Sequence, residues 1–178
     1  MNLFKKEGIQ MRYAGMIKND FTAAPGVCVS FFLQGCPIHC VGCHNPECWD
    51  FDGGREFTPA VLQEVLDAIE ANGIKRNFCV MGGEPLAEQN RFLTLLMCKT
   101  VREKYPDIKI YIWTGYTVEE LAEKRDKKID AILDGTYADF LIDGPFDYLQ
   151  RDVTLLMRGS TNQRIITLPY KEERVVPE

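Results

Sequence analysis

Three cysteines within eight residues constrain this chain more than any other feature of its sequence. Cys36, Cys40 and Cys43 have the spacing C-x-x-x-C-x-x-C and directly follow an apolar run at residues 27–33. A cysteine that only packs in a core needs no such neighbours. Because three thiolates on one short loop can converge on one point, the spacing predicts a loop that binds a metal cluster or a metal ion.

Three thiolates are one fewer than the four that normally close a [4Fe-4S] cluster. One iron would then be open to another molecule, by the logic that separates open catalytic zinc sites from closed structural ones. The spacing resembles the signature of the radical S-adenosylmethionine (SAM) enzymes. That resemblance implies that Cys36, Cys40 and Cys43 hold a [4Fe-4S] cluster whose open iron chelates the amino and carboxylate groups of SAM.

The cysteines also leave two alternatives, both less favoured. A zinc site could use Cys48 as a fourth ligand, but zinc sites usually pair C-x-x-C with a second pair well downstream, and the sequence holds none. A disulfide framework is disfavoured by the odd number of seven cysteines and by the absence of a secretory signal. A small iron–sulfur carrier or a zinc-binding interaction module remains the non-enzymatic alternative.

The composition argues against several classes of function. Hydrophobic residues make up 46% and charged residues 26% of the 178 residues, which is ordinary for a single globular domain spanning 1–178. The net charge of -5 gives no electrostatic footprint for nucleic acid. No apolar run is long enough to span a membrane, and residues 1–10 lack a signal-peptide core. We therefore expect a cytoplasmic protein that binds neither nucleic acid nor membrane.

Hydrophobic patterning predicts strands that alternate with helices. The apolar run at 27–33 is typical of a strand in a parallel sheet covered on both faces. It delivers the cysteine loop at its C-terminal end, where ligand sites of parallel α/β folds lie. Further strands are predicted at 11–20, 78–81, 108–113, 129–135, 139–144 and 165–168, with a loose extension at 1–10 and a frayed tail at 171–178.

Helix signals fall between these strands. Thr58-Pro59 indicates an N-cap followed by proline at the first helical position, and Asn72-Gly73 marks the end of that helix. A long helix is predicted at 88–105. Thr117 with Glu120 resembles a capping box that opens a shorter helix.

A second motif, Gly82-Gly83-Glu84-Pro85, directly follows the strand at 78–81. A glycine pair at a strand end permits close approach of backbone to a ligand or a strained turn, and Pro85 prevents the strand from continuing. Alone, this tetrapeptide indicates only a tight turn. Behind a three-cysteine loop, it resembles the radical-SAM motif that holds the amino group of SAM beside the cluster.

Several other residues have open roles. Tyr116 follows the strand at 108–113, and a partly buried tyrosine is its simplest interpretation. Asp134 and Asp143 each precede a glycine, where turn formation is the better interpretation. The polar stretch Arg158–Arg164 could contact SAM or a partner, or could be a solvated loop.

By these motifs the chain resembles the activating proteins of anaerobic ribonucleoside-triphosphate reductases, within the radical-SAM superfamily. The resemblance extends from Met11 to about Leu168. The sequence departs from the family pattern at two positions. Radical-SAM enzymes often have an aromatic residue just before the third cysteine, but this chain has Gly42, so His44 becomes a candidate for the contact with adenine. Cys28 stands where relatives commonly have arginine. The residues that carry the resemblance are Gly26-Val27, Gln34-Gly35-Cys36, Cys40, Gly42-Cys43-His44-Asn45-Pro46, Trp49, Met81-Gly82-Gly83-Glu84-Pro85, Trp113-Thr114-Gly115-Tyr116, Asp143-Gly144-Pro145-Phe146 and Arg158-Gly159-Ser160-Thr161-Asn162-Gln163-Arg164.

The resemblance implies a mechanism and partners. A flavodoxin or ferredoxin reduces the cluster, SAM is cleaved to methionine and a 5′-deoxyadenosyl radical, and that radical removes a hydrogen from one glycine of the large reductase subunit. SAM would be bound by Gly82, Gly83, Glu84 and Pro85, with His44 and Asn45 nearby. No side-chain acid or base is needed for transfer of a hydrogen atom.

The implied fold is an α/β partial, open (βα) barrel of the radical SAM type with about five or six mostly parallel strands, because a full barrel needs about 250 residues. Alternatives within the enzyme class are an activase of another glycyl radical enzyme, such as pyruvate formate-lyase, and a radical-SAM enzyme of deazapurine synthesis. Cys79 and Cys98 lie in core patterns and Cys48 follows the loop, so we predict that none of the three is a ligand.

Overall fold

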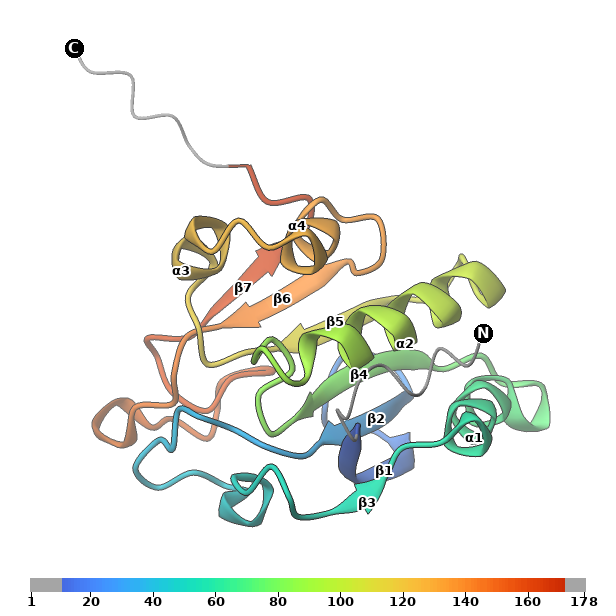
Figure 1. Cartoon of the computed structure of the whole chain (residues 1–178), viewed down its shortest axis with the longest axis horizontal. Helices are drawn as coiled ribbons and strands as arrows, with labels where there is room; N and C mark the ends of the chain where they lie inside the picture. The colour runs from blue at the N-terminus through green and yellow to red at the C-terminus, as the bar shows by residue number, and fades with distance from the viewer. Residues whose placement is uncertain (1–10, 172–178) are drawn as a thin grey trace.

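The computed structural model describes residues 11–171, and within that range the chain forms one mixed sheet of seven strands (Figure 1). The order across the sheet is β3-β1-β2-β4-β5-β6-β7. In chain order the strands are β1 (Arg12–Asp20), β2 (Cys28–Leu33), β3 (Arg55–Glu56), β4 (Asn77–Gly82), β5 (Ile110–Trp113), β6 (Phe140–Asp143) and β7 (Arg164–Thr167). The helices are α1 (Pro59–Ile69), α2 (Arg91–Lys104), α3 (Val118–Glu123) and α4 (Lys127–Leu133), with 3-10 turns η1 (Pro46–Cys48), η2 (Ala71–Gly73) and η3 (Tyr148–Gln150).

Four neighbouring strands, β2, β4, β5 and β6, run parallel to one another. Strands β1 and β3 on one side and β7 on the other pair antiparallel. The predicted α/β class and open sheet are confirmed, but the predicted count of five or six mostly parallel strands is wrong. Strands β1 and β2, and likewise β6 and β7, are joined by loops without an α-helix, and a parallel pairing needs a longer crossover.

The two faces of the sheet are covered differently. Alternate strand residues point to opposite faces, and side chains from all four helices join the larger core cluster on one face. The other face is covered by a smaller cluster that includes Cys28, Cys79 and Tyr111. The strand predicted at 27–33 is therefore buried on both faces as expected, but helices cover only one of them. The buried strand residues of the helix-covered face are Tyr13, Val29, Phe31, Leu33, Phe78, Val80, Ile110, Ile112 and Leu141.

Three helix signals are confirmed, with small shifts of boundary. Helix α1 begins at Pro59 after Thr58, and the chain leaves it through Asn72 and Gly73, both at positive φ. Helix α2 begins at Arg91 rather than residue 88, because the preceding residues form a turn. The capping box opening α3 is present: Thr117 Oγ1 accepts from Glu120 N, and Glu120 Oε2 accepts from Thr117 N.

The strand predicted at 129–135 is wrong, because Ile129 to Leu133 belong to α4. Asp126 is the N-cap of this helix and accepts hydrogen bonds from the backbone N–H groups of Lys128 (2.8 Å) and Ile129 (3.3 Å). Ile129, Ile132 and Leu133 are buried at i, i+3 and i+4 spacing, which fits one helix face. A short apolar run does not separate strand from helix. The strand predicted at 139–144 is confirmed as β6.

The terminal predictions fall outside the described residues: the extension at 1–10 entirely, and the tail at 171–178 except for Lys171. Among residues 11–171, no helix is both long enough and apolar enough to cross a membrane.

Candidate functional site

The C-terminal ends of the four parallel strands surround one cavity of about 140 Å³. All three motif cysteines line it, together with the Gly82–Glu84 turn that follows β4. The residues after β5 and β6 complete its wall. The sequence therefore placed both motifs at the correct edge of the sheet, and the structure brings them together. The lining residues are Cys36, Ile38, Cys40, Cys43, Gly82, Gly83, Glu84, Trp113, Thr114, Gly115, Gly144, Phe146 and Gln163.

A second cavity of about 490 Å³ shares Cys40 and Cys43 with the first. His44 and Asn45, the candidate residues that follow the third cysteine, line this second cavity but not the first. Its opposite wall comes from the β6–β7 loop, including Arg151, Val153 and Arg158.

The cysteine loop is fixed at its base. Gly35 N donates to Cys48 O (2.8 Å) and Cys36 N donates to Trp49 O (3.0 Å). The side chain of Gln34 reinforces this closure, since its Nε2 donates to Glu47 O (3.0 Å) and Asp50 O (2.6 Å). These contacts bring the start of the loop against η1, so the loop leaves β2 and returns to the sheet edge as one compact turn.

The three motif thiols are half-buried. Burial is the main cause that raises the pKa of Cys36 and Cys40 above the ordinary thiol value, and neighbouring Cys43 also raises that of Cys40. Thiolate ligands must lose these protons when a metal binds. Three convergent thiols on one cavity wall are the donor set that an iron–sulfur cluster uses, so these residues fit a cluster. No group of three or more His, Cys, Asp or Glu side chains within residues 11–171 is arranged for a single metal ion.

The Gly82–Gly83 pair allows two backbones to touch. A Cβ atom added to Gly83 would lie 2.4 Å from Gly35 O, and one added to Gly82, at φ +102, would lie 2.8 Å from Leu33 N. The close approach is made by hydrogen bonds from Gly83 N to Leu33 O and from Glu84 N to Gly35 O, both 2.8 Å. The turn is thus pinned directly to the start of the cysteine loop, which explains why this position requires glycine.

Glu84 is only 1% exposed, and its carboxylate is occupied within the protein. Oε1 accepts from Leu86 N (2.8 Å) and Thr114 Oγ1 (2.7 Å), and Oε2 accepts from Gly115 N (2.7 Å). Burial raises the pKa of Glu84 to about 7, while these hydrogen bonds act in the opposite direction. The carboxylate therefore joins the end of β4 to the end of β5 while lining the cavity.

Asn90 is a site residue that the sequence did not reveal. Its buried side-chain Nδ2 donates to Gln34 O (3.0 Å), Gly35 O (3.0 Å) and Glu84 O (2.9 Å). One amide thus ties the cysteine loop to the turn. The signal in the sequence was weak, since an asparagine before a long helix is an ordinary capping residue, and its partners lie up to 56 residues away.

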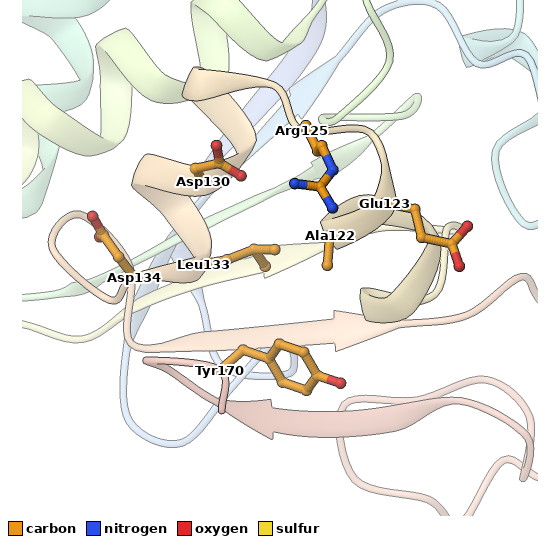
Figure 2. Close-up of a pocket in the computed structure, with 7 residues that line it drawn as sticks. All are labelled: Ala122, Glu123, Arg125, Asp130, Leu133, Asp134 and Tyr170. Carbon is orange, nitrogen blue, oxygen red and sulfur yellow. The ribbon is translucent and has the colours of Figure 1, made fainter. Parts of the chain in front are cut away.

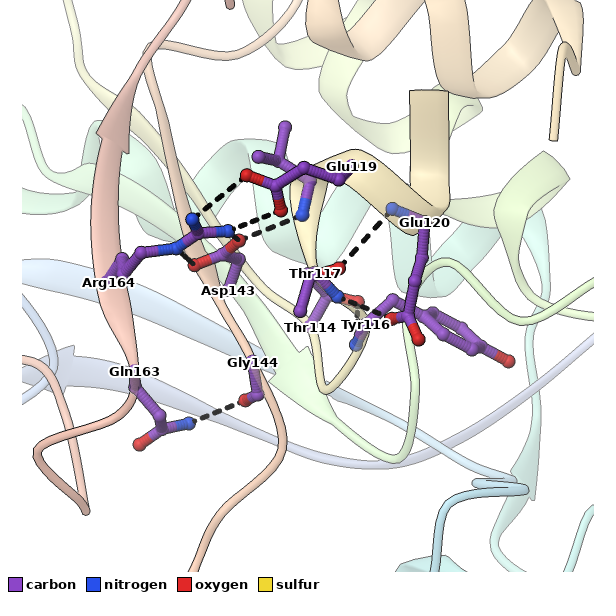
Figure 3. Close-up of polar contacts among 10 residues, drawn as sticks. Thr114, Tyr116, Thr117, Glu119, Glu120, Asp143, Gly144, Gln163 and Arg164 are labelled. Atoms are coloured by element: carbon purple, nitrogen blue, oxygen red, sulfur yellow. Dashed lines mark hydrogen bonds and ion pairs between the residues drawn. The ribbon is translucent and has the colours of Figure 1, made fainter. Parts of the chain in front are cut away.

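Asp143 does more than form a turn, contrary to the favoured interpretation. It is fully buried, accepts from Val118 N (2.8 Å), and pairs with Arg164 through both carboxylate oxygens. Arg164 also binds Glu119 with two hydrogen bonds of 2.9 and 2.7 Å, which holds the pKa of Glu119 down at about 2. Figure 3 shows this network, which locks β7 against α3.

In the rest of the polar stretch, some side chains make hydrogen bonds within the protein and others line the larger cavity. Gln163 Nε2 donates to Gly144 O (3.0 Å) and its Oε1 accepts from Gly159 N (2.8 Å). Arg158 lines the larger cavity, and its buried Nε has no hydrogen-bond partner within the described residues. The stretch is therefore not a freely solvated loop.

The structure shows the surroundings of the other residues whose roles were open. Asp134 forms a turn as predicted, accepting from Thr136 N (2.8 Å). Tyr116 is half-buried, with Lys124 Nζ 4.7 Å from its ring centroid. Cys28, Cys79 and Cys98 are fully buried, which confirms the core positions predicted for Cys79 and Cys98. Cys48 is buried too, and burial raises its pKa to about 11.

A separate cavity of about 540 Å³ lies beside α3, α4 and Tyr170 (Figure 2). Among the described residues, its lining includes the cation Arg125 and the carboxylates Glu123, Asp130 and Asp134. Neither the cysteines nor the Gly82–Pro85 turn contributes to it, so it is distinct from the site at the strand ends.

Comparison with known proteins gives a consistent picture. Residues 23–166 match the model of a family described as a 4Fe-4S single cluster domain. The chain is also similar to curated proteins named anaerobic ribonucleoside-triphosphate reductase-activating protein. The relative from Pasteurella multocida is 35% identical over 156 residues, covering 87% of this chain and 96% of its own length. Those from Escherichia coli K12 (32%; 86% and 96%) and from bacteriophage T4 (31%; 87% and 93%) are similar over nearly the same span.

Proposed function

This chain belongs to the family of anaerobic ribonucleoside-triphosphate reductase-activating proteins, and from that premise we propose that it is a radical SAM enzyme that generates the glycyl radical of that reductase. It is an activating enzyme with a 4Fe-4S cluster as its cofactor. The observation that carries the proposal is the single cavity that three half-buried thiols share with the Gly82–Glu84 turn.

Each motif has a role in the proposal. Cys36, Cys40 and Cys43 would hold the cluster through their three thiolates, and Gly82 and Gly83 line the same cavity. When bound, the cluster supplies the electron that cleaves SAM, which allows a hydrogen atom to be taken from a glycine of the reductase.

The turn after β4 is the proposed seat of the methionine end of SAM. Gly82 and Gly83 line the cavity and are only partly buried, and β4 ends at Gly82, before Pro85. Since the carboxylate of Glu84 already accepts three hydrogen bonds, its contribution is to hold this backbone in place as well as to line the cavity. His44 and Asn45, which line the larger cavity, are the proposed contacts of the adenosine end.

The remaining parts of the proposal concern fold, partners and location. The open sheet, with its site at the C-terminal ends of the parallel strands, supports a partial radical SAM barrel in one domain spanning 1–178.

A flavodoxin or ferredoxin supplies the electrons. A reducing cytoplasm suits a chain whose seven cysteines are all free thiols. The names of the relatives favour the anaerobic reductase over pyruvate formate-lyase as the partner.

Anaerobic reconstitution with iron and sulfide tests the proposal. After reduction with dithionite, we expect an electron paramagnetic resonance (EPR) signal that changes when SAM is added, and 5′-deoxyadenosine among the products. Addition of the reductase should then give a glycyl radical signal. A cluster whose signal is indifferent to SAM would refute the radical SAM assignment. Cleavage of SAM with no glycyl radical on the reductase would refute the partner.

A further inference from the structure

The loop between β6 and β7 exposes a group of large apolar side chains. Tyr148, Leu149, Val153 and Leu156, here called the rim residues, lie within nine residues of one another and are between 58% and 93% exposed. Isolated exposed apolar residues are common, but a group on one loop marks a surface that contacts another molecule.

Hydrogen bonds fix the backbone of the loop that carries the rim residues. Asp147 Oδ1 accepts from Leu149 N (2.9 Å), Thr161 N donates to Gln150 O (3.0 Å), and Asp152 N donates to Gly159 O (3.1 Å). These bonds clamp both arms of the loop together. The apolar side chains are therefore held outward by a fixed backbone, which lowers the cost of ordering them on binding.

The same loop forms the edge of the cysteine site. Val153 lines the larger cavity, which Cys40 and Cys43 also line. The ring of Tyr148 packs over Gly42, where an added Cβ would lie 2.7 Å from Tyr148 Cδ2. Phe146, two residues before Tyr148, lines the smaller cavity together with Cys40. Two of the four rim residues, Tyr148 and Val153, thus border the cysteine site, and Leu149 and Leu156 lie on the same loop.

We infer that the rim residues are the docking surface for the apolar segment of the reductase that flanks its reacting glycine, an inference that rests on the proposed function. A glycine has no side chain, so the site cannot distinguish one glycine from another at the reacting carbon. Selection must come from contacts with the residues around it. The surface placed to make them is the one beside the cavity mouth, and its chemistry calls for apolar side chains in the partner.

A second copy of this chain is a poorer occupant of the same surface. A stable self-association over the rim residues would cover the mouth of the cavity, and the proposed reaction requires that mouth to admit a protein backbone. Docking of a large protein substrate explains both why the rim residues are exposed and why they lie beside the cavity.

Two charge substitutions test the docking surface. Leu149→Asp and Leu156→Asp change side chains that are 93% and 62% exposed, and neither residue lines the cluster cavities. The matched controls are Phe21→Asp and Ile74→Asp, at side chains that are 72% and 53% exposed. Phe21 follows β1 and Ile74 precedes β4, so both lie at the opposite end of the parallel strands.

With the reconstituted protein, we expect each rim variant to bind the reductase about tenfold more weakly or worse. The yield of glycyl radical at subsaturating reductase should fall in parallel. Iron content and dithionite-driven SAM cleavage without reductase should match wild type, and the control variants should match wild type in every measurement.

Three results would overturn the inference. Rim variants that bind the reductase as tightly as the controls would exclude this surface while leaving the proposed function intact. Equal losses in rim and control variants would show a general effect of charge. Sedimentation showing a wild-type dimer that Leu149→Asp dissociates, with reductase binding unchanged, would assign the surface to self-association. By contrast, wild-type protein that cleaves no SAM would be a failure of the proposed function itself.

Discussion

The cysteine loop and the turn after β4, here taken as residues 82–86, both contribute to the same cavity, yet the fold holds them differently. The loop is closed at its base, while its three thiols stay half-buried. In the turn, Glu84 and Leu86 are almost fully buried, and the carboxylate of Glu84 accepts three hydrogen bonds. The turn is a preorganised wall built by the protein alone, whereas the loop presents side chains to a ligand. Variants in the loop should therefore affect function, and variants in the turn should affect stability first.

The largest effect should come from the loop. Cys36→Ser, Cys40→Ser and Cys43→Ser should each abolish stable cluster binding and SAM cleavage, because each removes one of three thiolate ligands. The fold should persist, since these side chains are half-buried at the edge of the sheet. Iron analysis measures the binding of the cluster, and circular dichroism measures the persistence of the fold. Cys48→Ser is the matched control and should keep its iron; its loss of the cluster would make Cys48 a ligand.

A methyl group in the turn should have the next largest effect. Gly83→Ala places a Cβ 2.4 Å from the backbone oxygen of Gly35, so the free energy of unfolding should fall by about 3 kcal/mol. Urea unfolding of the reconstituted protein measures it. Gly15→Ala is the control, because nothing lies within 4 Å of the added atom. Equal stability of the two variants would show that the turn is less tightly held than the contacts indicate.

The pH dependence of stability tests the buried carboxyl of the turn. Its pKa is raised from the ordinary 4.5 to about 7, so between these pH values the folded protein retains a proton that the unfolded chain releases. The corresponding stability is fully present below about pH 4.5 and is lost as the pH rises toward 7. Glu84→Gln should remove this slope in urea midpoints measured across the interval. Glu88→Gln, at an exposed position nearby, should retain the wild-type slope, and a slope unchanged in Glu84→Gln would contradict the assignment.

The smallest of these effects should come from the residue that joins the two regions. Asn90→Ala leaves three buried carbonyl groups without this donor and should cost about 2 kcal/mol of stability. Because the loop and the turn would then be less tightly coupled, SAM should also bind more weakly. Thermal unfolding and a SAM titration measure the two effects. Asn77→Ala, which removes exposed hydrogen bonds, is the control and should change stability less than Asn90→Ala does.

Features that depend on neighbouring residues could be predicted from the sequence alone. Each of these features is set by residues only a few positions apart. They are the cysteine spacing, the Gly82–Pro85 turn, the proline start of α1 and the capping box of α3. Their location at the C-terminal ends of parallel strands also followed, because a strand delivers its loop to that edge regardless of its neighbours. The comparisons with relatives confirmed the family that these local motifs indicated.

Contacts between distant segments could not be predicted in this way. Asn90 reaches residues 34 and 35, Arg164 reaches Asp143 and Glu119, and Tyr148 covers Gly42. The run at 129–133 became a helix because Asp126 capped it and because one face found a core to pack against. Such choices depend on which surfaces meet after the chain has folded. Local propensity cannot contain that information, because a pair of residues far apart in sequence gains its interaction energy only once the sheet has brought the pair together.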